Sequence, residues 1–399
     1  MARFEIEGNA KLSGKIKIAG NKNAVLPIMA ACLLTQGTSI LENVPNISDV
    51  DIMAQLLELC GAKIARFDES KMSIKTDEIK KAEFPNHLTE KLRASVLLIG
   101  PMLSRVGEVK MGYPGGDLIG RRPLETHIRA LESLGAKLEK EEDCYKGTAK
   151  NLKGADIFLP EASVTATENV LMAAVLADGD TTIKRSAAEP HVVDLCKFLV
   201  KMGAHIEGIG TSVLRIRGVQ KLQPTTHTIV ADHIEVGTFA ILAAVTPGTV
   251  EIQGIVKNDL DMILHVLKSF NVDFKIKGDS LIVGDTKLKA TERIVTDIWP
   301  GFATDLMAPT IVLATQAEGV TILHDWMYES RMFFVDKLLS MGAKVEIADP
   351  HRVLVYGPSK LRGQRLDTPD IRAGIALVIA ALAANGTSHI ERAELIERG

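Results

Sequence analysis

Residues 25–40 read VLPIMAACLLTQGTSI, an apolar stretch of helical length that ends at Gly37 and runs into a β-branched segment. The same arrangement returns five more times along the chain. The copies are Ala94 to Val109 through Gly107, Asn169 to Ile183 through Gly179, Val236 to Val250 through Gly248, Leu306 to Ile322 through Gly319, and Ala373 to Ile390 through Gly386. Because these glycines recur about every 70 residues, the sequence predicts a repeat architecture with six units.

A second feature of the repeat follows each glycine after about 24 residues, where an amphipathic helix ends in Gly-Ala and enters a strand. It occurs at 61–64, 135–138, 203–206 and 342–345, with a degenerate copy at 271–274. The sixth copy of this feature is not found. Since Lys-Leu-Ser-Gly at 11–14 matches Lys-Leu-Arg-Gly at 360–363, we expect residues 1–21 to close the last repeat.

The first helix of each repeat is apolar on nearly every side, which indicates a helix buried all round. Strands would then form outer sheets around three inner helices in each of two domains. We expect one domain at 22–230 and the other at 1–21 plus 231–399, with three repeats in each. A length of 399 residues with 46% hydrophobic residues suffices for two cores.

Composition excludes several classes of function. The net charge of −3 is spread over mixed acidic and basic residues, so a nucleic-acid partner is not expected. The apolar helices are shorter than the roughly 20 residues that a bilayer requires, and residues 1–7 alternate like a strand, unlike a signal peptide. We therefore expect a cytoplasmic protein without a membrane partner, with its four separated cysteines buried and reduced.

Polar residues lead into the apolar helices. Helix capping accounts for Asp232, Thr167, Asp305 and Asp370, because carboxylate and hydroxyl oxygens accept from free N–H groups. Capping does not account for Lys22, Arg93 and Arg372, whose positive charge opposes the helix dipole. If six helix N-termini converge on a cleft between the domains, free amides and basic side chains would bind a polyanionic substrate there.

The loop at 111–123 contains four glycines and two prolines, a composition that suits a mobile lid. An ordinary hairpin connection is the alternative. Asp117 and the pair Arg121-Arg122 could carry an acid and an anion clamp into the cleft. The chain has no P-loop, dinucleotide-binding or zinc-protease motif, so neither a cofactor nor a metal is expected.

Taken together, several motifs resemble those of the UDP-N-acetylglucosamine enolpyruvyl transferases over essentially the whole chain. They are Gly-Asn-Lys-Asn-Ala at 20–24, Arg-Ala-Ser at 93–95, Pro-Gly-Gly at 114–116, Ile-Gly at 119–120, Arg-Pro at 122–123, Thr-Asp at 304–305, Arg331, Asp-Ile-Arg-Ala at 370–373 and Glu-Arg-Gly at 397–399. The resemblance implies a two-domain inside-out α/β barrel of six βαβαββ repeats. It also implies a monomer that acts in peptidoglycan synthesis.

The resemblance carries over a set of site residues. Phosphoenolpyruvate would be bound by Lys22, Arg122, Arg331, Arg372 and Arg398. The UDP-sugar would be held by Asn23, Arg93, Arg122, Pro123, Leu124, Ser163, Val164, Thr304 and Asp305. Asp117, Lys22, Asp305 and Arg398 would be catalytic: Asp305 accepts the proton of the sugar 3-hydroxyl as that oxygen attacks C2 of the enol, and the cations stabilise the developing charge.

The chain departs from most of the family at Asp117, where a cysteine is usual and a subset carries aspartate. A carboxyl group can still donate a proton if an anion-crowded site raises its pKa, and it is a poorer nucleophile toward the epoxide fosfomycin. His233 stands where an arginine is expected, and Glu161-Ala162 precedes Ser163 where a lysine is common. A carboxylate at Glu161 would oppose a diphosphate unless it points away.

Three alternatives stay open at this point. A shikimate-3-phosphate enolpyruvyl transferase shares the fold and the chemistry, but Asn23, Arg122-Pro123 and Ser163-Val164 favour the sugar nucleotide. An RNA 3′-phosphate cyclase uses a related repeat, yet no matching histidine motif occurs among the ten histidines. A non-catalytic sugar-nucleotide binder would explain the absent lid cysteine but not the other retained residues.

Overall fold

The computed structural model describes residues 2–117, 119–284 and 286–399. Contacts divide the chain into two compact units. Unit 1 comprises Met1–Ala19, Asp117–Arg121 and Ala231–Gly399, and unit 2 comprises Gly20–Gly116 and Arg122–Val230. The chain thus crosses at 19/20 and 230/231, and the middle of the predicted lid groups with unit 1. Met1, within the predicted second domain, and Leu118, within the predicted lid, lie outside the described residues.

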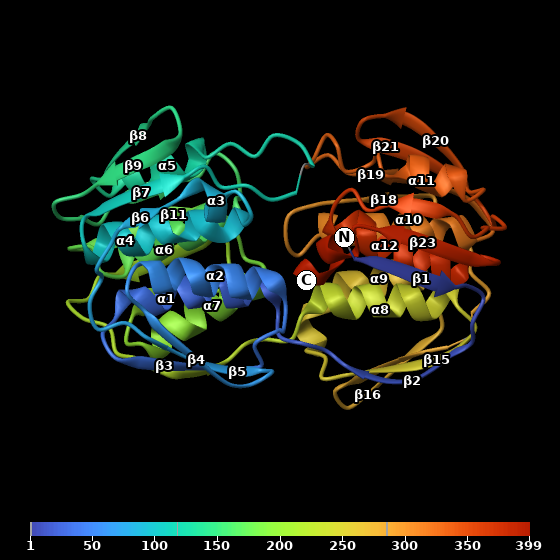
Figure 1. Cartoon of the computed structure of the whole chain (residues 1–399), viewed down its shortest axis with the longest axis horizontal. Helices are drawn as coiled ribbons and strands as arrows, with labels where there is room; N and C mark the ends of the chain where they lie inside the picture. The colour runs from blue at the N-terminus through green and yellow to red at the C-terminus, as the bar shows by residue number, and fades with distance from the viewer. Residues whose placement is uncertain (1, 118, 285) are drawn as a thin grey trace. The chain divides into compact units, whose positions relative to one another are not determined.

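Unit 2 contains three four-stranded sheets (Figure 1). Their orders are β14(Thr226–Thr228)-β3(Thr38–Glu42)-β5(Lys71–Lys75)-β4(Lys63–Asp68), β6(Glu83–Phe84)-β7(Glu108–Gly112)-β9(Cys144–Thr148)-β8(Lys137–Lys140), and β10(Asp156–Phe158)-β11(Asp180–Lys184)-β13(Val213–Arg217)-β12(His205–Glu207). The first two strands of each sheet are parallel and the other pairs are antiparallel. A helix connects β10 to β11, as a parallel pair requires.

Unit 1 repeats this pattern in its sheets. Their orders are β16(Phe274–Lys277)-β17(Ser280–Val283)-β15(Gly248–Gln253)-β2(Leu12–Lys17), β18(Arg293–Val295)-β19(Gly319–His324)-β21(Arg352–Gly357)-β20(Lys344–Asp349), and β1(Arg3–Glu7)-β23(Thr387–Glu391)-β22(Arg365–Asp367). The prediction that residues 1–21 close the last repeat is correct for β1, which pairs with β23. It is wrong for β2, which pairs in parallel with β15 at the start of another repeat.

The first strands of two repeats are exchanged between the units. β2 lies in a sheet of unit 1, but the chain leaves it for α1(Lys22–Ala31) of unit 2. In return, β14 lies in a sheet of unit 2 and leads into α8(His233–Val245) of unit 1. Hydrogen bonds anchor both crossings, because Val230 O accepts from Asn21 N at 2.7 Å and Ala19 O accepts from Asp232 N at 3.0 Å.

The predicted inner helices are buried, and each unit has its own hydrophobic core. The remaining helices of unit 2 are α2(Ser48–Leu59), α3(Asn86–Thr89), α4(Ile99–Arg105), α5(Glu125–Ser133), α6(Val164–Ala174) and α7(Pro190–Lys201). Those of unit 1 are α9(Asp261–Ser269), α10(Met307–Gln316), α11(Val335–Ser340) and α12(Ile371–Ala383). Short 3₁₀ helices are η1(Cys32–Leu34), η2(Arg93–Leu98), η3(Lys257–Asp259), η4(Thr304–Leu306) and η5(Ala393–Arg398). The six repeat glycines have positive φ, between 79° and 123°, where a side chain would strain the turn into the strand.

The second apolar stretch departs from one continuous helix, because it divides into η2 and α4. Pro101 has no N–H to donate to the preceding turn. The buried side chain of Asn169 bridges the pair of backbone groups one residue earlier: its Oδ1 accepts from Gly100 N and its Nδ2 donates to Val96 O, both at 2.7 Å. No pattern in the sequence indicates that a residue of α6 would stabilise this break.

Capping was predicted correctly at two of four positions. Asp232 accepts from Ile234 N and Glu235 N at the start of α8, and Asp370 accepts from Arg372 N and Ala373 N at the start of α12. Thr167 is not a cap, since Ser163 caps α6, and Asp305 instead binds two arginines. All four cysteines are free and buried, as expected. Among the described residues, no helix is both long and apolar enough to cross a bilayer.

Candidate functional site

A carboxylate held between two guanidinium groups lies at the centre of the unit 1 site residues. Asp305, in η4, has Oδ2 2.7 Å from Nη2 of Arg372 and Oδ1 3.2 Å from Nη2 of Arg331. Arg372 projects from the first turn of α12, which Asp370 caps. Charge-assisted hydrogen bonds thereby bring together three predicted residues that are distant in sequence.

The loop residue Asp117 belongs to the same neighbourhood of unit 1. Its Oδ1 lies 2.6 Å from Nη1 of Arg398, the residue that ends η5, and both side chains are largely buried. Arg331 is only 4% exposed, and its Nε is buried without a hydrogen-bond partner among the described residues. A buried N–H without a partner costs free energy, so this guanidinium has unused capacity to bind an anionic oxygen.

Charges in this group act on one another. Burial opposes the charge of Arg372, but the surrounding carboxylates, led by Asp305, outweigh burial and raise its pKa above the ordinary value. For Asp370, burial disfavours the charged carboxylate and so raises the pKa, and the capping hydrogen bonds partly offset this effect. His233 is buried at the start of α8, where desolvation lowers its pKa despite the neighbouring carboxylates, and its ring meets Trp299 edge to face. His233 therefore supplies no permanent positive charge here.

Thr304, predicted to contact the UDP-sugar, is bound by a residue that the sequence analysis missed. Its hydroxyl donates a short hydrogen bond to Oδ2 of Asp325, which is fully buried and also accepts from Thr296 and from Met327 N. Asp325 directly follows β19. Its position after an apolar strand resembles an ordinary loop, so only burial identifies it as a positioning residue for η4.

In unit 2, the predicted catalytic Lys22 forms an ion pair with Asp49 of α2. The Nζ to Oδ2 distance is 2.7 Å, and the side chains are 13% and 2% exposed. Asn21 caps α1 by accepting from Ala24 N, and Asn23 follows in the first turn. The Asp49 carboxylate compensates the positive charge of Lys22 within the protein, and the predicted binding of a ligand anion by Lys22 stays a prediction. Buried charges are retained in proteins when paired in this way.

Arg93 and Arg122 lie together in unit 2. Nη2 of Arg93 donates to the backbone oxygen of Arg122 at 2.5 Å. Pro123 and the buried Leu124 then lead into α5, whose N-cap residue is Leu124. This bond connects the start of η2 to the far end of the predicted lid.

Ser163 and Val164 begin α6, where the Ser163 hydroxyl accepts from Ala166 N. The Glu161 carboxylate accepts from the Thr126 hydroxyl at 3.0 Å, so it faces α5. His127 bonds Thr165 at 2.9 Å, and burial with the nearby Arg93 lowers the pKa of its ring to about 3. This neutral ring was also missed, since a lone histidine in an amphipathic helix gives no distinguishing pattern.

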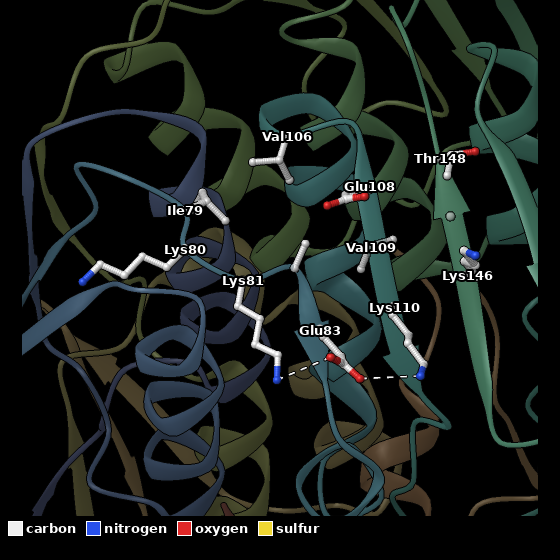
Figure 2. A pocket seen from close by; sticks show the side chains of 12 residues that line it. Ile79, Lys80, Lys81, Glu83, Val106, Glu108, Val109, Lys110, Lys146 and Thr148 are labelled. Atoms are coloured by element: carbon white, nitrogen blue, oxygen red, sulfur yellow. Dashed lines mark ion pairs between the residues drawn. The ribbon is translucent and has the colours of Figure 1, made fainter.

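A hollow of about 340 Å³ lies elsewhere in unit 2, over strands β6, β7 and β9 (Figure 2). It contains none of the predicted site residues. Figure 2 shows Glu83 between Lys81 and Lys110, at 3.4 and 3.5 Å. Because these side chains are exposed and partly neutralise each other, the hollow is a solvated charged face and not the candidate site.

Comparisons with known proteins agree with the predicted fold and family resemblance. The profile of the EPSP synthase (3-phosphoshikimate 1-carboxyvinyltransferase) family matches residues 6–399. A UDP-N-acetylglucosamine 1-carboxyvinyltransferase of Borrelia garinii subsp. bavariensis is 46% identical over 100% of this chain and 95% of its own. One from Bradyrhizobium diazoefficiens is 46% identical over 100% and 94%.

Two solved structures share the fold at lower identity. The enolpyruvyl transferase NikO from Streptomyces tendae aligns with a TM-score of 0.89 at 23% identity, covering 99% of this chain and 94% of that one. EPSP synthase from Acinetobacter baumannii aligns at 0.75 and 19% identity, covering 100% and 96%. These alignments confirm the predicted fold class.

Proposed function

The chain belongs to the UDP-N-acetylglucosamine 1-carboxyvinyltransferase family, and from that premise we propose that it transfers the enolpyruvyl group of phosphoenolpyruvate to the 3-hydroxyl of UDP-N-acetylglucosamine. Phosphate is the second product. The substrates are two small anionic molecules, and neither a cofactor nor a metal takes part. In the cell this reaction would be the first committed step of peptidoglycan synthesis, and through it would affect cell shape and division.

One observation carries the proposal: Asp305 lies between the guanidinium groups of Arg331 and Arg372, with Arg398 bound to Asp117 in the same unit. A donor with a carboxylate and a phosphate needs several fixed cations, which three arginines supply. A carboxylate among them can accept a proton while the cations offset the charge of the bound donor. The predicted cleft between the domains stays a prediction.

We assign the steps of the reaction as follows. The 3-hydroxyl oxygen of the sugar attacks C2 of phosphoenolpyruvate while Asp305 accepts the hydroxyl proton. Asp117 delivers a proton to C3, and a tetrahedral phospho-ketal forms. In the second step the Asp117 carboxylate takes a proton back from C3, the bond between C2 and the phosphate oxygen breaks, and Asp305 returns its proton to the departing phosphate, which restores the double bond. Lys22, Arg122, Arg331, Arg372 and Arg398 stabilise the charge on the phosphate and carboxylate groups.

The sugar nucleotide would contact Asn23, Arg93, Arg122, Pro123, Leu124, Ser163, Val164, Thr304 and Asp305. The position of Glu161 supports this acceptor, because its carboxylate is engaged by Thr126 and so is drawn toward α5. His233 does not add to the support for the sugar nucleotide. Burial lowers its pKa, and a neutral ring does not replace the positive charge of the arginine expected there.

The direct test is phosphate release from phosphoenolpyruvate with UDP-N-acetylglucosamine, compared with shikimate-3-phosphate, as acceptor. We expect release only with the sugar nucleotide. Release with shikimate-3-phosphate would transfer the assignment to the related enzyme class, and binding of the sugar nucleotide without any release would indicate a non-catalytic protein. Gel filtration and cell fractionation test the expected monomer and cytoplasmic location.

Fosfomycin resistance is the first specific prediction of this proposal. The carboxylate of Asp117 is a weaker nucleophile than a thiolate, and Arg398 binds it at 2.6 Å. We expect turnover to continue in fosfomycin and no covalent product to form. A mass increase of one fosfomycin molecule located on Asp117 would contradict this expectation; Asp117→Cys should gain the adduct and serves as the positive control.

A further inference from the structure

The first half of the predicted lid is docked within unit 2. Tyr113 N donates to Oδ1 of Asn86 at 2.8 Å, and Gly115 N donates to Thr89 O at 3.0 Å. Both acceptors belong to α3, the short helix at Asn86–Thr89. We call residues 112–116 the stem of the loop. Its backbone is held by α3 through hydrogen bonds of ordinary geometry.

Glycines in the stem permit this close approach. A Cβ at Gly112 would lie 2.2 Å from Oδ1 of Asn86, and one at Gly115 would lie 1.6 Å from Glu90 O. Gly116 has a φ of +109°, and a Cβ there would lie 2.9 Å from Cβ of Arg93. A side chain at Gly112 or Gly115 would therefore collide with Asn86 or with the backbone of Glu90, and the positive φ of Gly116 is one that glycine adopts readily.

Asn86 uses both ends of its amide. While Oδ1 accepts from Tyr113 N, its Nδ2 donates to Asp143 O at 3.0 Å in the turn between β8 and β9. The same turn holds the Tyr113 side chain, because its hydroxyl donates to Glu141 O at 2.6 Å and its ring meets Tyr145 edge to face at 5.2 Å. Asn86 thus ties three segments of unit 2 together: α3, the stem and the β8–β9 turn.

We propose that Asn86 is a positioning residue for the reaction, which fixes the stem at 112–116 and so the point from which Asp117 is presented. The inference deepens the proposed function and rests on it. The stem ends directly before Asp117. Arg93, which follows α3 and begins η2, donates to the backbone oxygen of Arg122 at the other end of the loop. The loop is therefore held at both ends in unit 2, and Gly116 and Gly120 have φ of +109° and +132°, which glycine adopts readily.

The test compares Asn86→Ala with Asn86→Asp, which keeps the acceptor for Tyr113 N and loses the donor to Asp143 O. Hydrogen exchange of the Tyr113 and Gly115 amides measures stem docking independently of activity. Phosphate release and UDP-N-acetylglucosamine binding without phosphoenolpyruvate measure function. Lys81→Ala, which removes only an exposed ion pair with Glu83, is the matched control.

For Asn86→Ala we expect faster exchange at Tyr113 and a fall in kcat of ~10-fold or more, since misplacement of reacting groups costs rate. The dissociation constant of the sugar nucleotide should change by less than about threefold, because that binding does not require Asp117. Asn86→Asp should restore most of both the protection and the rate. The control should match wild type in every measurement.

Two results would overturn the inference. Unchanged exchange at Tyr113 in Asn86→Ala would mean that the stem is not held by Asn86. Faster exchange with an unchanged kcat would mean that Asn86 is structural only. If wild type itself releases no phosphate, the proposed function fails instead, and the exchange data still decide whether the stem is docked. If Asn86→Ala does not fold, Asn86→Gln, which moves the amide away by one methylene, is measured in its place, with the same two outcomes read from its stem amides and its kcat.

Discussion

The two units use charge in different ways at their predicted site residues. In unit 1, Arg331 and Arg372 share the Asp305 carboxylate, and Arg398 binds Asp117. In unit 2, Lys22 has the buried Asp49 as a partner, Arg93 donates to the backbone oxygen of Arg122, and the Ser163 hydroxyl caps α6. Unit 1 thus links guanidinium groups to carboxylates, while unit 2 combines a buried ion pair with hydrogen bonds to backbone groups.

This difference teaches which substrate each unit is suited to bind. A small donor that is nearly all charge matches several guanidinium groups, and a sugar nucleotide offers many hydroxyl and amide groups to neutral partners. The contrast therefore predicts that substitutions in the ion pairs of Asp305 and Arg398 in unit 1 affect turnover most strongly, whereas loss of the buried carboxylate of Asp49 in unit 2 affects stability. The following predictions test this contrast in order of expected effect.

The largest effect is expected for Asp305→Ala. Loss of the proton acceptor should lower kcat by ~10³-fold, within the usual range for a general base. Binding of UDP-N-acetylglucosamine, measured by calorimetry, should remain detectable. Asp336→Ala, an exposed acidic residue in the first turn of α11, is the control and should retain full activity. Wild-type turnover in Asp305→Ala would remove this residue from the mechanism.

Arg398→Ala should lower kcat/KM for phosphoenolpyruvate by ~10²-fold, as expected when a charged donor is lost from an anion site. Steady-state kinetics at varied phosphoenolpyruvate measures this. Arg392→Ala provides a matched control, since that arginine also ends in an ion pair, with Asp367, but is more exposed. Equal losses in both variants would show that ion pairing alone, and not the position of Arg398, determines the effect.

In unit 2, Asp49→Ala leaves the ammonium of Lys22 without its carboxylate in a site where little water reaches it. Breaking such a buried pair should lower the free energy of unfolding by ~3 kcal/mol. Urea denaturation measures the loss. Asp51→Ala, on the same turn of α2 and 57% exposed beside Arg66, should be close to neutral. A stability of Asp49→Ala equal to that of wild type would argue that the pair is not buried.

The smallest effect concerns pH. Since burial lowers the pKa of His127 to about 3, from 6.5, the folded protein keeps the ring neutral while the unfolded chain takes up a proton below pH 6.5. The stability from this neutral ring is present above pH 6.5 and is lost as the pH falls toward 3. Between pH 7 and 5, His127 should account for a loss of about 2 kcal/mol.

Urea denaturation at the two pH values tests this, with His127→Gln expected to lose correspondingly less than wild type. His205→Gln, on the exposed edge of β12, should behave as wild type. An identical pH dependence in His127→Gln and wild type would exclude a role for this ring.

Much of the fold could be predicted because the pattern that determines it is repeated. Six apolar stretches with a glycine at the same position specify buried helices leading into strands. The structure adds what a periodic pattern cannot specify: the side chain of Asn169 that bridges Gly100 N and Val96 O beside Pro101, and the pairing of β2 with β15. Both depend on contacts between residues far apart in the chain.

The site residues could be inferred only through motifs that resemble a known family, since single arginines and aspartates have no distinctive spacing. Partners such as Asp49, Asp325 and Asn86 were missed for the same reason. Each is a polar residue at an ordinary position in a helix or loop. Burial and hydrogen bonding give these residues their importance, and neither can be read from the chain in one dimension.

The exchange of β2 and β14 has a consequence for how the protein is made. Every residue of the sheets of unit 2 precedes Ala231, so those sheets can be completed early during translation, whereas β1 and β2 must wait for β23 and β15. A strand whose edge is still unpaired promotes aggregation, and lysine side chains commonly protect such edges. Lys15 and Lys17 of β2 are exposed, and residues of this kind suit a strand whose partner emerges from the ribosome much later.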